Sequence, residues 1–287
     1  MDWALAAARF AHFVSLMSLF GALVYATVLS PAALAPKLAP YLSNTAAPLA
    51  ALALASALGW AALVARAMLG GELDLDGFVS VLTGTSFGAV WLVRLPVLAA
   101  LLALTLLAGR RWRSLAVAAG LSLASLALVG HAVMQTGALG VLHRANHATH
   151  LLLTGGWLGG LPPFLISLSA YARNSHRAEA LAAMMRFSRV GHYAVAGIFL
   201  TGALDVALTT RSLPWPPSSP YRIGLDSKIT VFAVMTALAL FNRYALAPRI
   251  GRSAGARHAL AAGAAAEIAL AACAVALVSV FATLDPA

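Results

Sequence analysis

Eight apolar stretches follow one another along the chain, and short polar loops separate them. Each stretch is close to the roughly 20 apolar residues that a membrane-spanning helix needs. We therefore expect an all-α integral membrane protein with eight transmembrane helices, built as a single transmembrane domain over residues 1–287. The expected spans are 9–30, 46–69, 86–108, 114–136, 145–170, 188–210, 227–248 and 258–283.

Composition agrees with this pattern, because 61% of the 287 residues are hydrophobic and 10% are charged. A soluble domain usually carries about 25% charged residues. The chain has a single cysteine, Cys273, in an apolar stretch, which excludes an intrachain disulfide and a thiolate metal cluster. The net charge of +10 comes from arginines in short loops, so we expect membrane lipid around the protein and no nucleic-acid partner.

The charged residues predict the orientation in the membrane. The loops after spans three, five and seven hold the arginine clusters, whereas most acidic residues lie in the other loops. By the positive-inside rule, the arginine-rich loops are cytoplasmic and both termini are periplasmic. The arginines of these loops are Arg110, Arg111, Arg113, Arg173, Arg177, Arg186, Arg189, Arg249, Arg252 and Arg257.

This orientation brings five of the eight histidines toward the outer face. His147 and His150 are three residues apart and share one helix face, as do His131 and Met134. Imidazole and thioether ligands together suit copper, especially Cu(I). His143 stands beside Arg144 and is interpreted as an ordinary loop histidine. The candidate metal ligands are His12, His131, Met134, His147 and His150.

Four charged residues fall inside or at the edge of the expected spans, where an unpaired charge is costly. Asp205 is a candidate partner for Arg94, since both are expected in the outer parts of their spans. Lys228 is either interfacial or part of an ion path. Glu267, near the middle of span eight, is protonated, paired or part of an ion path.

Two spacings recur and suggest an internal duplication. Phe87 precedes Arg94 by seven residues, as Tyr221 precedes Lys228, and the offset between the cations is 134 residues. His12 precedes Gly21 by nine residues, as His150 precedes Gly159, at an offset of 138. We expect two parallel four-helix repeats, 1–140 and 141–287, with His12 and His150 at equivalent positions.

The segment after His150 is predicted to be a packing surface rather than a ligand set. Small residues let membrane helices approach closely, and the two proline residues are expected to break or kink span five near its inner end. The residues concerned are Gly155, Gly156, Trp157, Gly159, Gly160, Pro162 and Pro163.

Short motifs follow one another over most of the chain. They are Thr85-Ser86-Phe87-Gly88 with Trp91 and Arg94, Gly130-His131-Ala132, His150-Leu151-Leu152, Trp157-Leu158-Gly159-Gly160-Leu161, Thr201-Gly202, Tyr221 with Lys228, Asn242-Arg243 and Pro248. In this order and spacing they resemble the copper resistance protein D family of bacterial inner-membrane proteins. The sequence departs from the family at His147, where an acidic residue is frequent, and at Arg222, where a glycine is frequent. The resemblance implies an eight-span protein that handles copper, by uptake across the inner membrane.

The leading hypothesis is a copper transporter and not an enzyme, which captures copper at the outer histidines and passes it inward between the two halves. The sequence has no Walker motif, so transport would be passive or driven by an ion gradient. Because no extracellular copper-binding domain is appended, we expect a separate periplasmic copper-binding partner. Two alternatives stay open. The first is a membrane cytochrome that exchanges electrons with quinone and binds haem b through His12 with His150, or through His131 with His147. The second is a copper chaperone or oxidase assembly factor that does not transport copper.

Overall fold

The computed structural model describes residues 2–107, 109, 111–174, 176–210 and 219–284, without the side chains of His131 and Ala132. Every regular element in this part of the chain is helical. The short η elements are π-helical in η1 and η5 and 3₁₀-helical elsewhere. In order they are α1 (Trp3–Val24), η1 (Tyr25–Leu29), η2 (Ala32–Leu34), α2 (Ala35–Met68), α3 (Leu75–Gly84), α4 (Ser86–Leu107), α5 (Trp112–Ala124), η3 (Ser125–Leu128), η4 (Gly130–Val133), α6 (Gly137–Leu158), α7 (Leu161–Ala172), α8 (Arg177–Thr210), α9 (Pro220–Phe241), η5 (Asn242–Leu246), η6 (Ala247–Arg249) and α10 (Ala254–Phe281).

Within the described residues, seven helical segments are long and apolar enough to cross a membrane, which confirms the all-α membrane class. They are Trp3–Leu29, Ala32–Met68, Ser86–Leu107, Gly137–Ala172, Arg177–Thr210, Pro220–Arg249 and Ala254–Phe281.

The fourth expected span, 114–136, is shorter than predicted. Its helix is Trp112–Leu128, made of the 13 residues of α5 and the 4 of η3. Beyond it, Gly130 has a φ of +77°, a left-handed conformation that interrupts any helix. The expectation of one continuous helix to residue 136 is therefore wrong, and the eighth membrane crossing stays a prediction.

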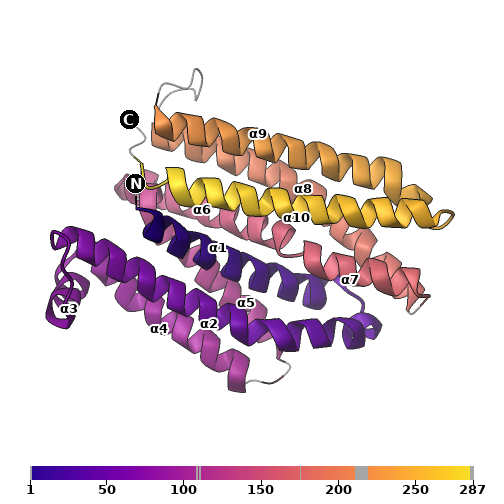
Figure 1. Ribbon diagram of the computed structural model, residues 1–287, viewed down its shortest axis with the longest axis horizontal. Helices are drawn as coiled ribbons and strands as arrows, with labels where there is room; N and C mark the ends of the chain where they lie inside the picture. The colour runs from indigo at the N-terminus through magenta and orange to yellow at the C-terminus, as the bar shows by residue number, and fades with distance from the viewer. Residues whose placement is uncertain (1, 108, 110, 175, 211–218, 285–287) are drawn as a thin grey trace.

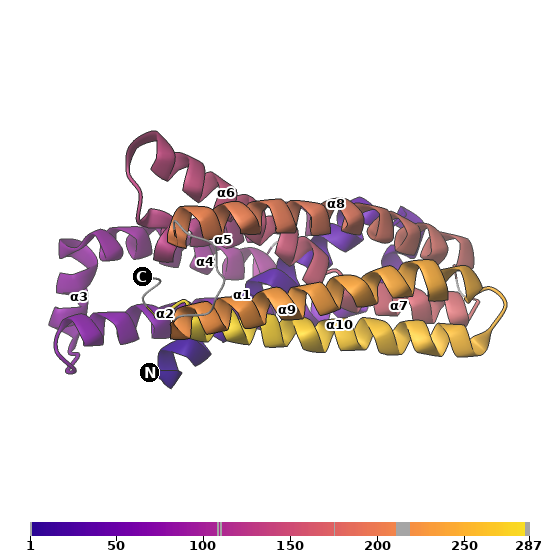
Figure 2. The ribbon, with the colours of Figure 1, turned by 90° about the horizontal axis from the view of Figure 1, so that it is seen from above.

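The long helices run side by side along the molecule, and the start of α1 and the end of α10 lie at the same end (Figure 1). Viewed from above, α9 and α10 lie beside each other along the bundle (Figure 2). Helix α1 is central, because it packs against α2, α5, α6 and α10. The shared end agrees with the expectation that both termini face one side of the membrane.

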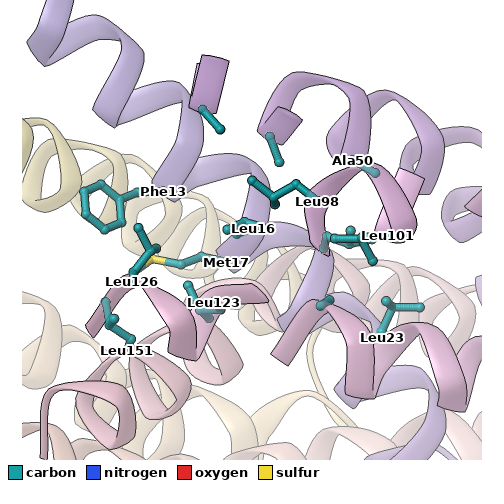
Figure 3. Packing of buried hydrophobic residues seen from close by; sticks show 14 of the residues in the cluster. Phe13, Leu16, Met17, Leu23, Ala50, Leu98, Leu101, Leu123, Leu126 and Leu151 are labelled. Atoms are coloured by element: carbon teal, nitrogen blue, oxygen red, sulfur yellow. The ribbon is translucent and has the colours of Figure 1, made fainter. Parts of the chain in front are cut away.

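The buried apolar residues form two main clusters. The first gathers α1, α2, α4 and α5, and Figure 3 shows Leu16, Leu98 and Leu101 within it. The second is built mostly from α7, α8, α9 and α10. Since lipid is as apolar as leucine, close side-chain packing rather than exclusion from water holds these helices together.

The two groups of helices meet at a glycine contact between α1 and α6. A Cβ on Gly21 would overlap backbone atoms of Gly155 and Gly159, and a Cβ on Gly159 would overlap the Met17 carbonyl. The glycine run is thus a packing surface, as predicted. It also ends α6, and α7 starts with Pro162 in its first turn, so the predicted break in span five is confirmed.

Candidate metal site

A cavity of about 190 Å³ is lined by residues near the start of α1, such as Arg9, and near the end of α10, such as Phe281. We call it the histidine cavity. Helices α1, α6, α8, α9 and α10 all contribute to its wall. Its ionisable lining residues are Arg9, His143, His147, His150, Asp205, Tyr221 and Lys228.

Two histidines of α6 are held by α8 in the same way. The His147 ring donates from Nδ1 to Asp205 Oδ2 at 2.8 Å. The His150 ring donates from Nδ1 to Thr201 Oγ1 at 2.9 Å, because the Thr201 hydroxyl itself donates to the Gly197 carbonyl at 2.6 Å. The two rings are nearly parallel, with centroids 6.3 Å apart.

This arrangement leaves Nε2 of both rings as a lone-pair donor. Neither Nε2 atom has a hydrogen-bond partner within the described part of the chain. A histidine that ligates a metal through one nitrogen normally donates from the other to a carboxylate, hydroxyl or carbonyl, which fixes its tautomer. His147 and His150 already have that second interaction in place.

Asp205 is the centre of the polar network around these rings. It accepts from Asn146 Nδ2 at 2.6 Å and lies 3.7 Å from His143 Nε2. His143 donates from Nδ1 to Gln135 Oε1 at 2.5 Å, and Gln135 in turn donates to the Leu208 carbonyl at 2.7 Å. His143 is only 1% exposed and belongs to α6, so its interpretation as a loop histidine is wrong.

Arg94 does not pair with Asp205, contrary to the sequence-based expectation. Its guanidinium donates from Nη2 to His12 Nε2 at 2.8 Å and from Nη1 to Ser125 Oγ at 3.0 Å. His12 donates from Nδ1 to the Ala53 carbonyl at 2.8 Å. Both nitrogens of His12 are therefore occupied, and His12 is outside the lining of the histidine cavity.

The expected five-ligand set is not assembled. Met134 is 54% exposed in the bend after η4 and does not line the cavity. The side chain of His131 lies outside the described residues, while its backbone belongs to η4. Since η4 is a single 3₁₀ turn, His131 and Met134 do not share an α-helical face. Over the side chains that the structure describes, no three His, Cys, Asp or Glu residues form a ready metal cluster.

The cavity also holds polar groups that sequence reasoning missed. Arg9 lies over the Trp60 ring at 5.0 Å and donates from Nη1 to the Ala282 carbonyl at 3.1 Å. Thr154 Oγ1 is buried and has no partner among the described atoms, so a ligand in the cavity could satisfy it. The one available signal was helical spacing, because Arg9 precedes His12 by three residues and Asn146 precedes His150 by four.

Glu267 lies apart from the histidines, in α10. Its Oε1 accepts from Asn242 Nδ2 at 2.7 Å. It lines a second cavity of about 430 Å³, which we call the glutamate cavity. Lys228, in contrast, lines the histidine cavity. Of the four supporting residues named from the sequence, Asp205 and Lys228 therefore belong to the histidine site, and Arg94 and Glu267 do not.

Comparisons with known proteins agree with the membrane fold. Residues 1–141 match the family model of the copper resistance protein D-like N-terminal domain, and residues 181–281 match that of copper resistance protein D. The inner membrane protein YebZ of Escherichia coli (strain K12) is 33% identical over 249 residues, which are 85% of this chain and 84% of that protein. Copper resistance protein D of Pseudomonas syringae pv. tomato is 29% identical over 270 residues, 86% of this chain and 83% of that protein. No solved structure matches the chain.

Proposed function

Because the chain belongs to the copper resistance protein D family of multi-pass inner-membrane proteins, we propose that it transports copper from an outward-facing site formed by His147 and His150. Copper handling at the membrane follows from the family. Capture at these two rings and inward transfer are the further steps of the proposal.

The orientation of the two rings carries the proposal. Their Nε2 atoms are free, their Nδ1–H groups are fixed on Asp205 and Thr201, and imidazole is a good ligand for copper. The Asp205 carboxylate supplies negative charge next to His147, which offsets the charge that a copper ion brings into a partly buried site. A water-accessible mouth is consistent with the partial exposure of the His147 side chain, which is 31%.

The position of the site bears on the path within the protein. The histidine cavity is lined by α6, α8, α9 and α10 of the second half, and by α1, α2 and the segment from η3 to η4 of the first half. A path from this site would therefore begin between the two halves. We also propose that a separate periplasmic protein delivers copper, because the cavity opens at the end of the bundle that we expect to face outward.

Copper binding to purified protein tests the capture step. We expect the wild type to bind copper, and His147→Ala and His150→Ala each to lower the affinity by at least tenfold, since each removes one of the two free Nε2 ligands. His192→Ala is the matched control, because His192 lines the glutamate cavity and bonds Tyr244 and its own helix. Equal copper binding by the wild type and both cavity variants would contradict the proposed site.

Copper accumulation separates transport from the chaperone alternative. Cells that express the wild type should accumulate more copper than cells that express His150→Ala at the same protein level. A protein that binds copper at this cavity but leaves accumulation unchanged would instead be a chaperone or assembly factor. The haem pairing of His12 with His150 gains no support, since both nitrogens of His12 are engaged by protein groups.

A further inference from the structure

The glutamate cavity contains one polar corner in an otherwise apolar wall. Asn242 and Glu267 form that corner and are 5% and 4% exposed. Asn242 opens the π-helical turn η5, a kind of irregularity that is frequent at functional sites. Gly263 on α10 makes room for it, because a Cβ there would overlap the Asn242 amide.

The hydrogen bonding of this pair is incomplete. Asn242 donates from Nδ2 to Glu267 Oε1, while Asn242 Oδ1 has no partner among the described atoms although it is fully buried. A buried acceptor without a donor is costly, because it loses its hydrogen bond to water and gains none in the protein. The corner therefore lacks one hydrogen-bond donor.

Four helices, α6, α8, α9 and α10, contribute to the walls of both cavities. On α9, Lys228 lines the histidine cavity, Thr236 lines the glutamate cavity, and Phe232 lies between them on the same face. Trp157 of α6 packs edge-on against Phe232, with centroids 6.4 Å apart at 89°.

We propose that Glu267 and Asn242 form the binding site of a proton that is coupled to copper movement. This inference rests on the proposed copper transport. A proton on Glu267 Oε2 forms an O–H bond, and this hydroxyl is the donor that Asn242 Oδ1 lacks. Binding adds one proton and neutralises the carboxylate, and release returns the proton and the negative charge without any redox change.

The ligand set favours a proton over a metal ion. Ca²⁺ takes six to eight oxygen ligands and Mg²⁺ takes six, whereas the corner offers one carboxylate and one carboxamide. Copper(I) prefers sulfur or nitrogen ligands to oxygen. A single carboxylate with one amide neighbour is sufficient for a proton, and buried carboxylates in membrane helices commonly serve in proton relays.

The other ionisable groups near this corner already have partners. Arg243 donates from Nη1 to Ser188 Oγ and lies over the Tyr244 ring at 5.6 Å, although its buried Nε has no partner among the described atoms. His192 contacts Tyr244 Oη at 3.1 Å. On the side of α7, Tyr171 accepts from Arg177 at 3.1 Å, and Tyr25 of η1 donates to Ser167 at 2.8 Å. Glu267 is thus the acidic group of the cavity that is placed to exchange a proton.

Infrared spectroscopy of the purified full-length protein tests the proton site directly. We expect a carboxylic-acid C=O band that is present in the wild type, absent in Glu267→Gln and shifted in Asn242→Leu. Glu72→Gln is the matched control, because Glu72 is exposed in the loop before α3. Absence of a Glu267-dependent acid band at any pH at which the protein is folded would overturn the proposal, whatever the copper measurements show.

Proteoliposomes test the coupling. In the wild type, copper entry should be accompanied by proton movement. The rate of copper entry should change at least severalfold when a pH gradient is imposed. Glu267→Gln should lose both responses while it retains copper binding at the histidine cavity, and Glu267→Asp should restore part of them. Copper flux in the wild type without proton movement overturns the coupled proton but leaves the proposed function intact. Absence of copper flux overturns both transport and its coupling, and the infrared band then decides the proton site alone.

Discussion

Each half of the chain holds a histidine in a similar place, but only the histidine of the first half has hydrogen-bond partners for both ring nitrogens within the part of the chain that the structure describes. In both, a ring donates from Nδ1 to the neighbouring long helix: His12 to the Ala53 carbonyl of α2, and His150 to Thr201 Oγ1 of α8. The other nitrogen differs. Arg94 donates to His12 Nε2, whereas His150 Nε2 faces no partner among the described residues.

The helices that carry these groups match in length. Helices α1 and α6 both have 22 residues, α2 and α8 both have 34, and α4 and α9 both have 22. Arg94 is the ninth residue of α4 and Lys228 the ninth of α9. The duplication stays a prediction, and these equal lengths support it.

The difference shows how one scaffold can serve two purposes. In the first half, a long guanidinium reaches the imidazole and fills the space with protein, so that the group is a fully buried structural contact. In the second half, the cation is the shorter side chain of Lys228, and a cavity of about 190 Å³ lies beside it and His150. The proposed ligand site is thus the place where the protein does not occupy its own acceptor.

The largest effect is expected where the two halves touch. In Gly159→Leu the new side chain would overlap the Met17 carbonyl of α1, and no rotamer change relieves a clash at Cβ. Overpacking of a tight core already costs about 1–3 kcal/mol, and here the obstacle is backbone, so we expect loss of the folded protein. Size-exclusion chromatography and thermal unfolding in detergent measure it.

Two further variants serve as a control and as a reciprocal test of this contact. Gly191→Leu is the matched control on α8, because a Cβ at Gly191 meets nothing within 4 Å. Gly21→Leu should be as damaging as Gly159→Leu, since the contact is reciprocal. A folded Gly159→Leu with an unchanged melting temperature would show that the halves do not meet as described.

The next largest effect is a difference between Arg94 and Lys228 in what each contributes to stability and to copper affinity. Arg94→Met leaves the buried His12 Nε2 without a donor, which should cost about 1–3 kcal/mol of unfolding free energy and leave copper binding little changed. Lys228→Met should leave stability nearly unchanged, because no hydrogen bond or ion pair of Lys228 is present among the described residues. It should bind copper more tightly, since it removes a like charge from the cavity.

Thermal unfolding and copper titration of both proteins check this pair, with Arg94→Lys as the control that retains the charge. If Lys228→Met is the less stable protein and Arg94→Met the one with altered copper affinity, the assignment of the two halves is reversed.

The helices could be predicted from the sequence because a membrane leaves the backbone few choices. Without water to satisfy amides, apolar stretches must form helices, so hydropathy alone placed seven of the spans. It failed at the end of the fourth, where the positive φ of Gly130 has no hydropathy signal. The helix α3 was also missed, since its ten residues are too short for a span.

The sequence predicts which site residues share one helix, but not which residues of other helices they contact. The three-residue spacing of His147 and His150 placed both on one face of α6. Their partners Thr201 and Asp205 come from α8, and a single sequence does not state which helices are neighbours. For the same reason Arg94 was assigned to Asp205 and not to His12, although all three were recognised as polar groups within spans.

The smallest effect tests the hydrogen bond behind each histidine. Thr201→Val keeps the shape of the side chain and removes the acceptor of His150 Nδ1–H, so the ring loses its fixed tautomer. Removal of such a partner lowers metal affinity by about 10–100-fold in known sites, and we expect about tenfold here. Ser56→Ala is the counterpart in the first half. It should leave copper affinity unchanged, since His12 retains the Ala53 carbonyl at 2.8 Å and the Ser56 contact is longer, at 3.3 Å. Copper titration of the two variants decides the comparison: a tenfold loss in Ser56→Ala would mean that His12 takes part in copper binding after all.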